Sequence, residues 1–278
     1  MTSGGAVSLR CPDCAKAVGA LEDGVQCRGC GRRFAPAEGV WDLLPAVLGA
    51  PTRSEDRLHE QDAVPTWRRL FYHKRDWIEW CDARWLPELI GPGARTFLEV
   101  GGGLCYASAL AKARLPRGTV VATDVSPRYL RRHALAVGRI LGAPADVYAA
   151  ADVERLPFED GQFDAVYSQV VLYRVPDPVR ALREIRRVLA PGGRYLGIER
   201  ASPWALLFRE DRTMRARAAA RGIAERPLRY WEWERLLRAA GLAAAALRPV
   251  PGRRVRSALL RRAGNAVRQI HVAISFHG

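Results

Sequence analysis

Short apolar runs alternate with amphipathic segments between residues 94 and 202. An apolar run of four to eight residues that ends in turn or polar residues predicts a buried strand. Such runs lie within 94–101, 119–126, 163–169 and 193–202. The segments 126–141 and 177–188 repeat their apolar residues at three- and four-residue steps, which predicts helices. Alternation of strand and helix predicts an α/β fold, with a parallel sheet covered by helices on both faces.

Residues 67–90 precede this region and carry an apolar stripe at helical spacing. The stripe consists of Trp67, Leu70, Phe71, Trp77, Ile78, Cys81, Trp85 and Leu89. This pattern predicts one amphipathic helix, or two short helices broken before Pro87, with its aromatic side chains in the core. Tyr72 and His73 lie off the stripe.

Residues 48–66 contain Gly, Pro, Ser and charged residues without an apolar period, which predicts a linker. The chain then divides into a module at 1–47, a linker at 48–66 and a larger domain at 67–278. A short apolar segment, GVWDLLPAV, ends the module. Phe34, Val40, Trp41, Leu43 and Leu44 are expected to close the module's own hydrophobic face or to dock it on the larger domain, with Asp42 facing the other way.

Four of the six cysteines form two Cys-x-x-Cys pairs in the module, Cys11 with Cys14 and Cys27 with Cys30. Two such turns can aim four sulfurs at one point, and four thiolates in a tetrahedron are a preferred zinc site. A closed set of four ligands makes the zinc structural, since a segment of about 40 residues buries too little apolar surface to fold alone. The alternative is a fortuitous set of four thiols.

The net charge of +15 raises the question of a nucleic-acid partner. Only three of the 44 basic residues are lysines, which indicates that compositional bias contributes to the charge. One local run, Arg248–Arg268, holds seven arginines and no acid, so an anionic partner stays open. Since no apolar run reaches the ~18 residues of a membrane span and no signal peptide is visible, we expect a soluble, cytoplasmic protein without a membrane span. The sequence leaves the oligomeric state open.

The chemistry is concentrated where the predicted strands end. Glu99 directly precedes a glycine-rich turn, in Glu-Val-Gly-Gly-Gly. A nicotinamide dehydrogenase would also carry such a turn after a strand. A carboxylate at this place would repel a pyrophosphate and attract an ammonium or sulfonium group, which favours a cofactor without phosphates.

The order of these features resembles the class I S-adenosylmethionine-dependent methyltransferases over residues 94–202. The stretch LPFEDGQFDAVYSQVVLYRVPDPVRALREIRRVLAPGGRYL resembles the subgroup that includes quinone-biosynthesis enzymes. The resemblance implies a Rossmann-like fold with a mostly parallel seven-stranded sheet and S-adenosylmethionine as cofactor. It also implies cofactor-binding roles for Glu99, Gly101 and Gly103 at the methionine end, Asp124 and Val125 at the ribose, Asp152 and Val153 at the adenine, and Ser168 and Gln169 beside the methionine.

Two departures from the family pattern stand out. Cys105 occupies the place of a third glycine in the first motif. Tyr173 and Arg174 stand where relatives often have paired histidines, so no histidine acid or base can be assigned there. The pattern over residues 9–45 resembles a short zinc-binding domain found beside many methyltransferases, including a bacterial family that methylates a guanine of large-subunit ribosomal RNA.

The catalytic group is less clearly marked, because methyl transfer needs a general base only when the nucleophile arrives protonated. Tyr173, His73 and Glu199 are the candidates, and Arg200 lies beside Glu199 at a strand end. Three other histidines are given structural roles. His133 is expected to be solvated on an arginine-rich helix, and His271 and His277 to belong to the final edge strand.

Three functions stay open. The core motifs favour a small-molecule acceptor. An RNA acceptor is the alternative, because the segment 202–241 mixes aromatic residues with arginines, which suits base stacking and phosphate binding. A non-catalytic protein that keeps the fold is the third, and the intact Glu99, Asp124 and Asp152 argue against it.

Overall fold

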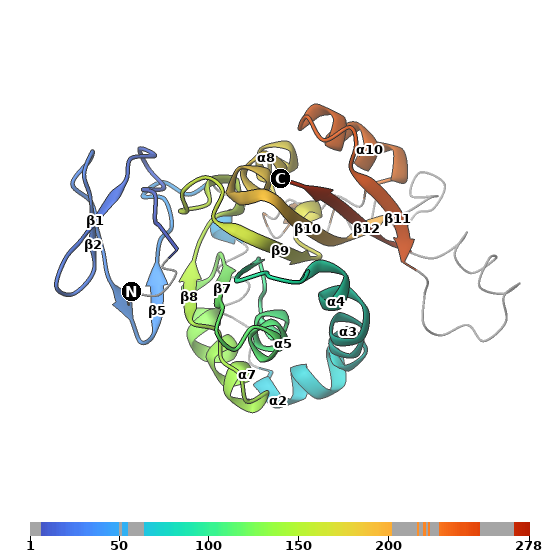
Figure 1. Ribbon diagram of the computed structural model, residues 1–278, viewed down its shortest axis with the longest axis horizontal. Helices are drawn as coiled ribbons and strands as arrows, with labels where there is room; N and C mark the ends of the chain where they lie inside the picture. The colour runs from blue at the N-terminus through green and yellow to red at the C-terminus, as the bar shows by residue number, and fades with distance from the viewer. Residues whose placement is uncertain are drawn as a thin grey trace, which may run out of the picture.

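A nine-stranded sheet forms the centre of the protein in the computed structural model (Figure 1). The structure describes residues 7–49, 52–54, 64–201, 216, 219–220, 222, 228–250 and 270–278. The strand order is β11-β12-β10-β9-β6-β7-β8-β5-β4. The bounds are β4 Pro36–Ala37, β5 Val40–Asp42, β6 Thr96–Val100, β7 Thr119–Asp124, β8 Val147–Ala150, β9 Phe163–Gln169, β10 Leu189–Ala201, β11 Ala246–Val250 and β12 Ile270–His277.

Seven of these strands, β6 to β12, form the sheet that the sequence predicts. The pairs among β6 to β10 are parallel, and β12 runs antiparallel to both β10 and β11. Because β12 lies between those two strands, the expectation that His271 and His277 belong to an edge strand is wrong; β11 is the edge. The sheet also has two strands more than predicted, because β5 and β4 of the N-terminal module join it.

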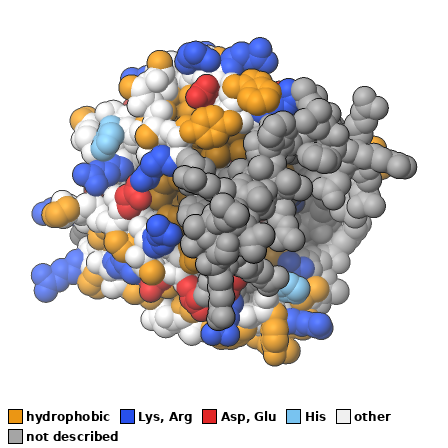
Figure 2. All heavy atoms as spheres, turned by 90° about the vertical axis from the view of Figure 1, so that its right-hand side faces the viewer, with side chains coloured by type: hydrophobic (Ala, Val, Ile, Leu, Met, Phe, Trp, Pro, Cys, Tyr) orange, Lys and Arg blue, Asp and Glu red, His pale blue; other side chains and the backbone are white. Residues whose placement is uncertain are grey.

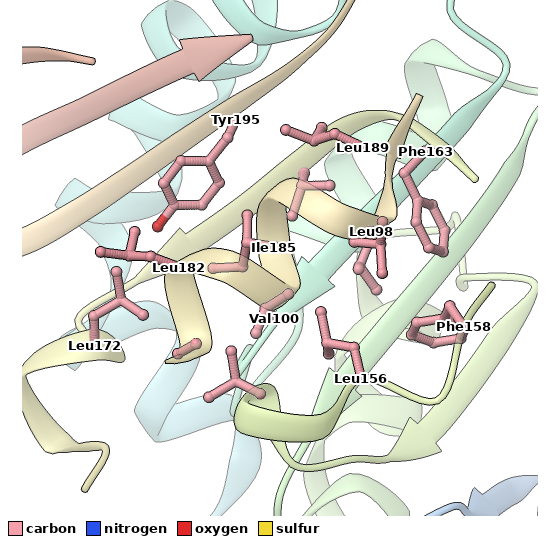
Figure 3. Close-up of a cluster of buried hydrophobic side chains, with 14 of the residues drawn as sticks. Leu98, Val100, Leu156, Phe158, Phe163, Leu172, Leu182, Ile185, Leu189 and Tyr195 are labelled. Carbon is pink, nitrogen blue, oxygen red and sulfur yellow. The ribbon is translucent and has the colours of Figure 1, made fainter. Parts of the chain in front are cut away.

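Helices cover both faces of the sheet, as predicted (Figure 1). One face carries α5 Tyr106–Arg114 and α7 Leu135–Ile140, and the other carries α8 Pro178–Val188 and α10 Tyr230–Ala239. Asp177 caps α8 by accepting a hydrogen bond from Arg180 N, and Pro178 at the first position fits the cap. Leu182 and Ile185 of α8 lie buried in one cluster with Leu98 of β6 (Figure 3).

The segment 67–90 is helical, but it breaks elsewhere than predicted. It comprises α2 Thr66–Arg68, the π-helical turn η1 Arg69–His73, α3 Arg75–Trp80, the π-helical turn η2 Cys81–Trp85 and α4 Leu86–Leu89. The break falls at Lys74, with φ −117° and ψ −3°, and Pro87 lies in the first turn of α4, where its missing N–H costs little. Trp67 and Phe71 are more than half exposed, so their expected place in the core is wrong.

The helix after β7 begins as its sequence indicates. Ser126 Oγ accepts a hydrogen bond from Tyr129 N, and Pro127 starts α6 Pro127–Tyr129. The π-helical turn η3 Leu130–Ala134 continues it into α7. His133 is buried, and its Nδ1 lies 2.9 Å from Thr66 Oγ1, because the start of the 66–89 segment covers this helix. The expectation that His133 is solvated is therefore wrong.

The N-terminal module joins the central sheet. Its own small sheet contains β1 Val18–Ala20, β2 Val25–Cys27 and β3 Arg33–Phe34. Strand β5 pairs in parallel with β8, and Leu43 N donates a further hydrogen bond to Ala150 O at 3.0 Å. Val40, Leu43 and Leu44 are buried in clusters that include residues of the large domain, while Asp42 is exposed. The apolar segment thus docks the module, one of the two roles expected for it.

Some expectations fall on residues outside the described ranges. Most of the 202–241 segment and of the arginine run at 248–268 lies there. Within the described ranges, α10 lies in the 202–241 segment, and Arg248 of the arginine run forms an ion pair with Glu88. None of the helices in these ranges is both long and apolar enough to cross a membrane.

Candidate functional site

The glycine-rich turn connects β6 to α5 and requires its glycines. Gly101 and Gly103 have φ values of +61° and +56°, a region that disfavours side chains. A Cβ on Gly101 would lie 2.6 Å from Val171 Cγ2, so the backbone here approaches a second loop closely. Cys105 also takes a positive φ of +51° at the place of the third glycine of the family pattern. The turn therefore brings the backbone at the end of β6 close to the loop that carries Val171.

Glu99 lies beneath this turn and does not line the cavity described below. Its Oε2 accepts hydrogen bonds from Ser108 N and Ser108 Oγ, both at 2.6 Å, in the first turn of α5. Burial raises the pKa of Glu99 to about 7, against the opposing effect of the bonds from Ser108. The carboxyl group therefore supports the turn from below, which differs from the direct contact with a charged cofactor that the sequence suggests.

Asp124 and Asp152 follow β7 and β8 and face the same cavity. Asp124 Oδ2 accepts a hydrogen bond from Gly103 N at 2.8 Å, and Oδ1 accepts one from Ser126 N at 3.0 Å. Asp152 Oδ1 accepts one from Glu154 N at 2.9 Å, which caps the short helix η4 Val153–Arg155. Burial raises the pKa of Asp152 above its usual value. Each carboxylate keeps lone pairs for a ligand, because a carboxylate has about four acceptor positions.

A cavity of about 380 Å³ lies over the carboxyl ends of β6 to β10, where parallel sheets bind their ligands. Seven of the nine predicted cofactor-binding residues line it: Gly101, Gly103, Asp124, Val125, Asp152, Val153 and Gln169. Glu99 and Ser168 do not. Ser168 is fully buried, and its Oγ lies 2.8 Å from Tyr195 Oη, because it points to the opposite face of β9 from Gln169.

Gln169 lines this cavity, and two tyrosine hydroxyl groups hold its amide in place. Its Oε1 accepts from Tyr106 Oη and, at 3.2 Å, from Tyr167 Oη. Among the residues that the structure describes, its Nε2 is buried and has no hydrogen-bond partner. A buried donor without a partner costs free energy, so a ligand that accepts from Nε2 would be stabilised here.

The catalytic candidates lie in different places. Tyr173 lines the cavity and is almost fully buried. Glu199 is fully buried outside the lining, and it accepts hydrogen bonds from the backbone N atoms of residues 171–173 at 2.9 to 3.4 Å. Burial raises the pKa of Glu199 to about 7. His73 is exposed and does not line the cavity. Of the three, only Tyr173 is placed to reach a ligand.

Sequence reasoning missed two basic residues of the cavity. Arg69 and Lys74 line it together with Arg174 and Arg200, and Tyr129 lies beside them in the lining. The helical pattern of 67–90 assigns Lys74 to an ordinary polar face. Only the break at that residue brings it to the cavity, and nothing in the local pattern marks the break.

The four module cysteines converge, as their spacing predicts. Their sulfur atoms all lie within 4.8 Å of one another, with 3.7 Å between Cys11 and Cys30 and 3.3 Å between Cys14 and Cys27. Gly29 N and Cys30 N donate to Cys27 Sγ at 3.3 and 3.4 Å. The cluster is a candidate metal centre at the end of β2, and Cys11 and Cys27 are buried.

Comparison with known proteins agrees with this geometry. Residues 98–197 match the family described as a methyltransferase domain. The fold is that of a class I methyltransferase. The matched residues run from β6 into β10 and so include the glycine turn, both acids and Gln169.

Curated relatives match part of the chain. An uncharacterized protein of transposon TN4556 in Streptomyces fradiae is 41% identical over 87 residues, which cover 31% of this chain and 24% of that protein. The ubiquinone/menaquinone biosynthesis C-methyltransferase UbiE of Bordetella avium is 38% identical over 112 residues, 40% of this chain and 42% of that enzyme. The chain thus spans less than half the length of each.

Solved structures match more of the chain at lower identity. Geranyl diphosphate C-methyltransferase from Streptomyces coelicolor A3(2) has a TM-score of 0.57 and 16% identity, over 83% of this chain and 98% of that one. A chain from the complex of the Haloferax volcanii Trm112 methyltransferase activator with a methyltransferase has a TM-score of 0.54 and 19% identity, over 76% and 95%. These likenesses show a shared fold.

Proposed function

We propose that the protein transfers a methyl group from S-adenosylmethionine to a small-molecule acceptor. The observation that carries the proposal is the cavity over the sheet, which joins the glycine turn, the two acids and the amide of Gln169. The match of residues 98–197 to a methyltransferase domain supports it.

The polar side chains of the cavity suit this cofactor. Asp124, at the end of β7, has acceptor positions for two ribose hydroxyls, and Asp152, after β8, has them for an adenine amine. Gln169 Nε2 would donate to the methionine part, where a carboxylate needs donors. S-adenosylmethionine would supply an electrophilic methyl group on its sulfonium. The leaving group would be a neutral thioether, which needs no acid to depart.

The chain itself would orient the acceptor and exclude water. Gly101 brings the backbone close to Val171, and the loop that carries Val171 is held by Glu199. Rigid placement of two reactants lowers the barrier by removing orientational freedom, and this step needs no general base when the nucleophile is already deprotonated. Tyr173 is the side chain best placed to contact the acceptor, because it is the candidate that lines the cavity.

A small-molecule acceptor fits better than RNA. The cavity is lined by a mixture of buried and half-buried residues, which suits a small molecule, and the UbiE relative is named as a C-methyltransferase of quinone biosynthesis. On the face of the molecule drawn in Figure 2, the coloured side chains show basic groups dispersed among acidic and apolar ones. An electrostatic footprint for a phosphate backbone would be a continuous basic stripe.

The test is transfer of label from S-adenosyl[methyl-³H]methionine in a cell extract freed of endogenous cofactor. Extract is divided into a low-molecular-weight fraction, total RNA and protein, and each is incubated with the enzyme. We expect label in the low-molecular-weight fraction, abolished by S-adenosylhomocysteine. Label in RNA would show that the acceptor is RNA and not a small molecule. Label in no fraction would contradict the proposed activity.

We also propose that the four module cysteines hold one structural zinc ion. A tetrahedral site with Zn–S bonds of about 2.3 Å places its sulfurs about 3.8 Å apart, close to the observed spacing. The backbone donors at Cys27 Sγ suit a thiolate, since N–H groups stabilise negative sulfur. In this proposal, residues 1–47 remain a zinc module and residues 67–278 the methyltransferase domain.

A further inference from the structure

Four basic side chains converge on one part of the cavity. Arg69 and Lys74 come from the segment 66–89, Arg174 from the short helix η5 Leu172–Arg174 after β9, and Arg200 from the end of β10. All four are half-buried. The chain therefore brings cations from three separate elements to the same space.

Lys74 shows how closely these charges approach one another. Burial lowers the pKa of its ammonium, and the charges of Arg174, Arg200 and Arg69 lower it further. Within the part of the chain that the structure describes, Lys74 has no carboxylate partner in an ion pair. A buried cation beside other cations is unfavourable unless an anion compensates it.

His271 lies beside the same charges. Its ring packs against Trp77, with 4.7 Å between the ring centroids, and His271 pairs with Arg200 across β12 and β10. Burial first, and then Arg200 and Lys74, lower the pKa of His271 to about 4. The imidazole is therefore neutral near pH 7 and adds no charge to the cluster.

Tyr173 holds two of the cations in place. The guanidinium carbons of Arg174 and Arg200 lie 5.3 and 5.2 Å from the centre of its ring, and Arg174 Nε donates to Tyr173 Oη at 2.7 Å. The backbone of Tyr173 is bound in turn to the carboxylate of Glu199. The two guanidinium groups are thus supported by a buried aromatic platform, which reduces the ordering that anion binding would require.

The order of strands separates Arg174 and Arg200 from the two acids. Asp124 and Asp152 follow β7 and β8, whereas Arg174 and Arg200 follow or end β9 and β10, and β6 lies between the two groups. A cofactor whose ribose and adenine lie over β7 and β8 leaves the β9–β10 side to the acceptor. This division rests on the proposed function.

We propose that the acceptor carries a phosphate or carboxylate group, which binds among Lys74, Arg174 and Arg200. A guanidinium group binds either anion through two parallel hydrogen bonds, and an ammonium adds a point charge. Anchoring the anion at these residues would leave the rest of the acceptor directed toward the glycine turn, where the methyl group would be presented.

The test is a calorimetric titration of inorganic pyrophosphate, and separately of phosphate, at fixed ionic strength. Each is measured in the full-length protein with and without saturating S-adenosylhomocysteine. We expect saturable binding that is retained in the presence of S-adenosylhomocysteine and weakened at least tenfold in Lys74→Gln and in Arg200→Gln. The affinity for S-adenosylhomocysteine should change less than threefold in both variants.

The matched control is Arg75→Gln, which removes one positive charge next to Lys74. Arg75 is largely exposed and pairs with Glu79 one helical turn away, so its replacement should leave pyrophosphate binding unchanged. If pyrophosphate binding were weakened equally in this control, the weakening would follow from the loss of net positive charge alone, and the proposal would be overturned.

Two further outcomes would overturn it in distinguishable ways. If S-adenosylhomocysteine displaces pyrophosphate, and the Lys74 and Arg200 variants lose affinity for both, the cluster holds the cofactor's own carboxylate. If S-adenosylhomocysteine binds and pyrophosphate does not, the anionic acceptor is wrong while the proposed function stands. Failure of S-adenosylhomocysteine to bind would instead contradict the proposed function, on which the inference rests.

Discussion

Glu99 is a buried carboxyl group whose titration affects folding stability. Its pKa is raised from 4.5 to about 7 by burial, so the folded state binds more protons than the unfolded state between these values. The stability that this adds is fully present below pH 4.5 and is lost as the pH rises through about 7. Glu99→Gln removes the titration and keeps an acceptor for Ser108.

We therefore expect the wild type to lose about 3 kcal/mol of unfolding free energy relative to Glu99→Gln between pH 5 and pH 8. Urea unfolding at several pH values measures the difference. Glu22→Gln, on the exposed surface, controls for loss of one carboxyl group. A constant difference between wild type and Glu99→Gln across this range would show that Glu99 does not titrate there.

Gly101→Ala should impair both stability and cofactor binding. The positive φ makes a side chain cost about 1 to 2 kcal/mol, and the new methyl group would force Val171 toward the cavity. We expect the affinity for S-adenosylhomocysteine to fall at least tenfold. Gly142→Ala is the matched control, since Gly142 has a φ of +74° and no neighbour within 4 Å of a Cβ. It should lose stability and keep its affinity, and equal affinities in the two variants would contradict the close-approach argument.

Individual site residues were predictable where the chemistry coincides with a strand end. Asp124 is the last residue of β7 and Gln169 the last of β9, and both line the cavity. Ser168 and Glu99 lie outside the lining of the cavity, because the direction of a side chain at the end of a strand depends on the register and the turn that follows. Lys74 could not be predicted, since its position depends on a helix break that no proline or glycine marks.

At the scale of elements, β5 is the clearest link between module and large domain. Leu43 is 2% exposed and packs in a cluster that includes residues of β6 and β7. Leu43→Ala should therefore lower the unfolding free energy by about 3 kcal/mol. Val47→Ala, at a side chain that is 76% exposed, should change it by less than about 0.5 kcal/mol.

Calorimetry can show whether the two parts unfold together. If β5 joins them as the sheet indicates, Leu43→Ala lowers the temperature of a single transition that includes the large domain. A separate early transition, with the main one unchanged, would show that the module unfolds alone and that β5 contributes little to the sheet.

The strands and helices of residues 94–202 were predictable because their apolar periods are local. The predicted strand 163–169 coincides with β9, and the predicted helix 177–188 coincides with α8. The pairing of β5 with β8 was not predictable, because parallel strands more than 100 residues apart leave no local sign of their register. A three-residue strand also shows too short an alternation to be recognised.

At the scale of the whole molecule, we expect the cysteine cluster to stabilise the large domain as well as the module. Leu9 forms a bridge with Phe158, so the module contacts the large domain beyond β5. We expect one zinc per chain by mass spectrometry of the metal, its loss in Cys27→Ser, and its retention in Cys81→Ala, where the cysteine lies in the core of the large domain. Metal loss should lower the melting temperature by at least about 5 °C. An unchanged melting temperature in metal-free wild type would contradict a structural zinc.

Calorimetric titration of S-adenosylmethionine is the most direct test of whether the cavity over β6 to β8 binds this cofactor. We expect one site per chain in the wild type and in Asp23→Asn, which changes an exposed acid of the module. At least tenfold weaker binding is expected in Asp124→Asn at a temperature where the variant is folded. No binding to the wild type, or equal binding to all three proteins, would contradict cofactor binding at this cavity.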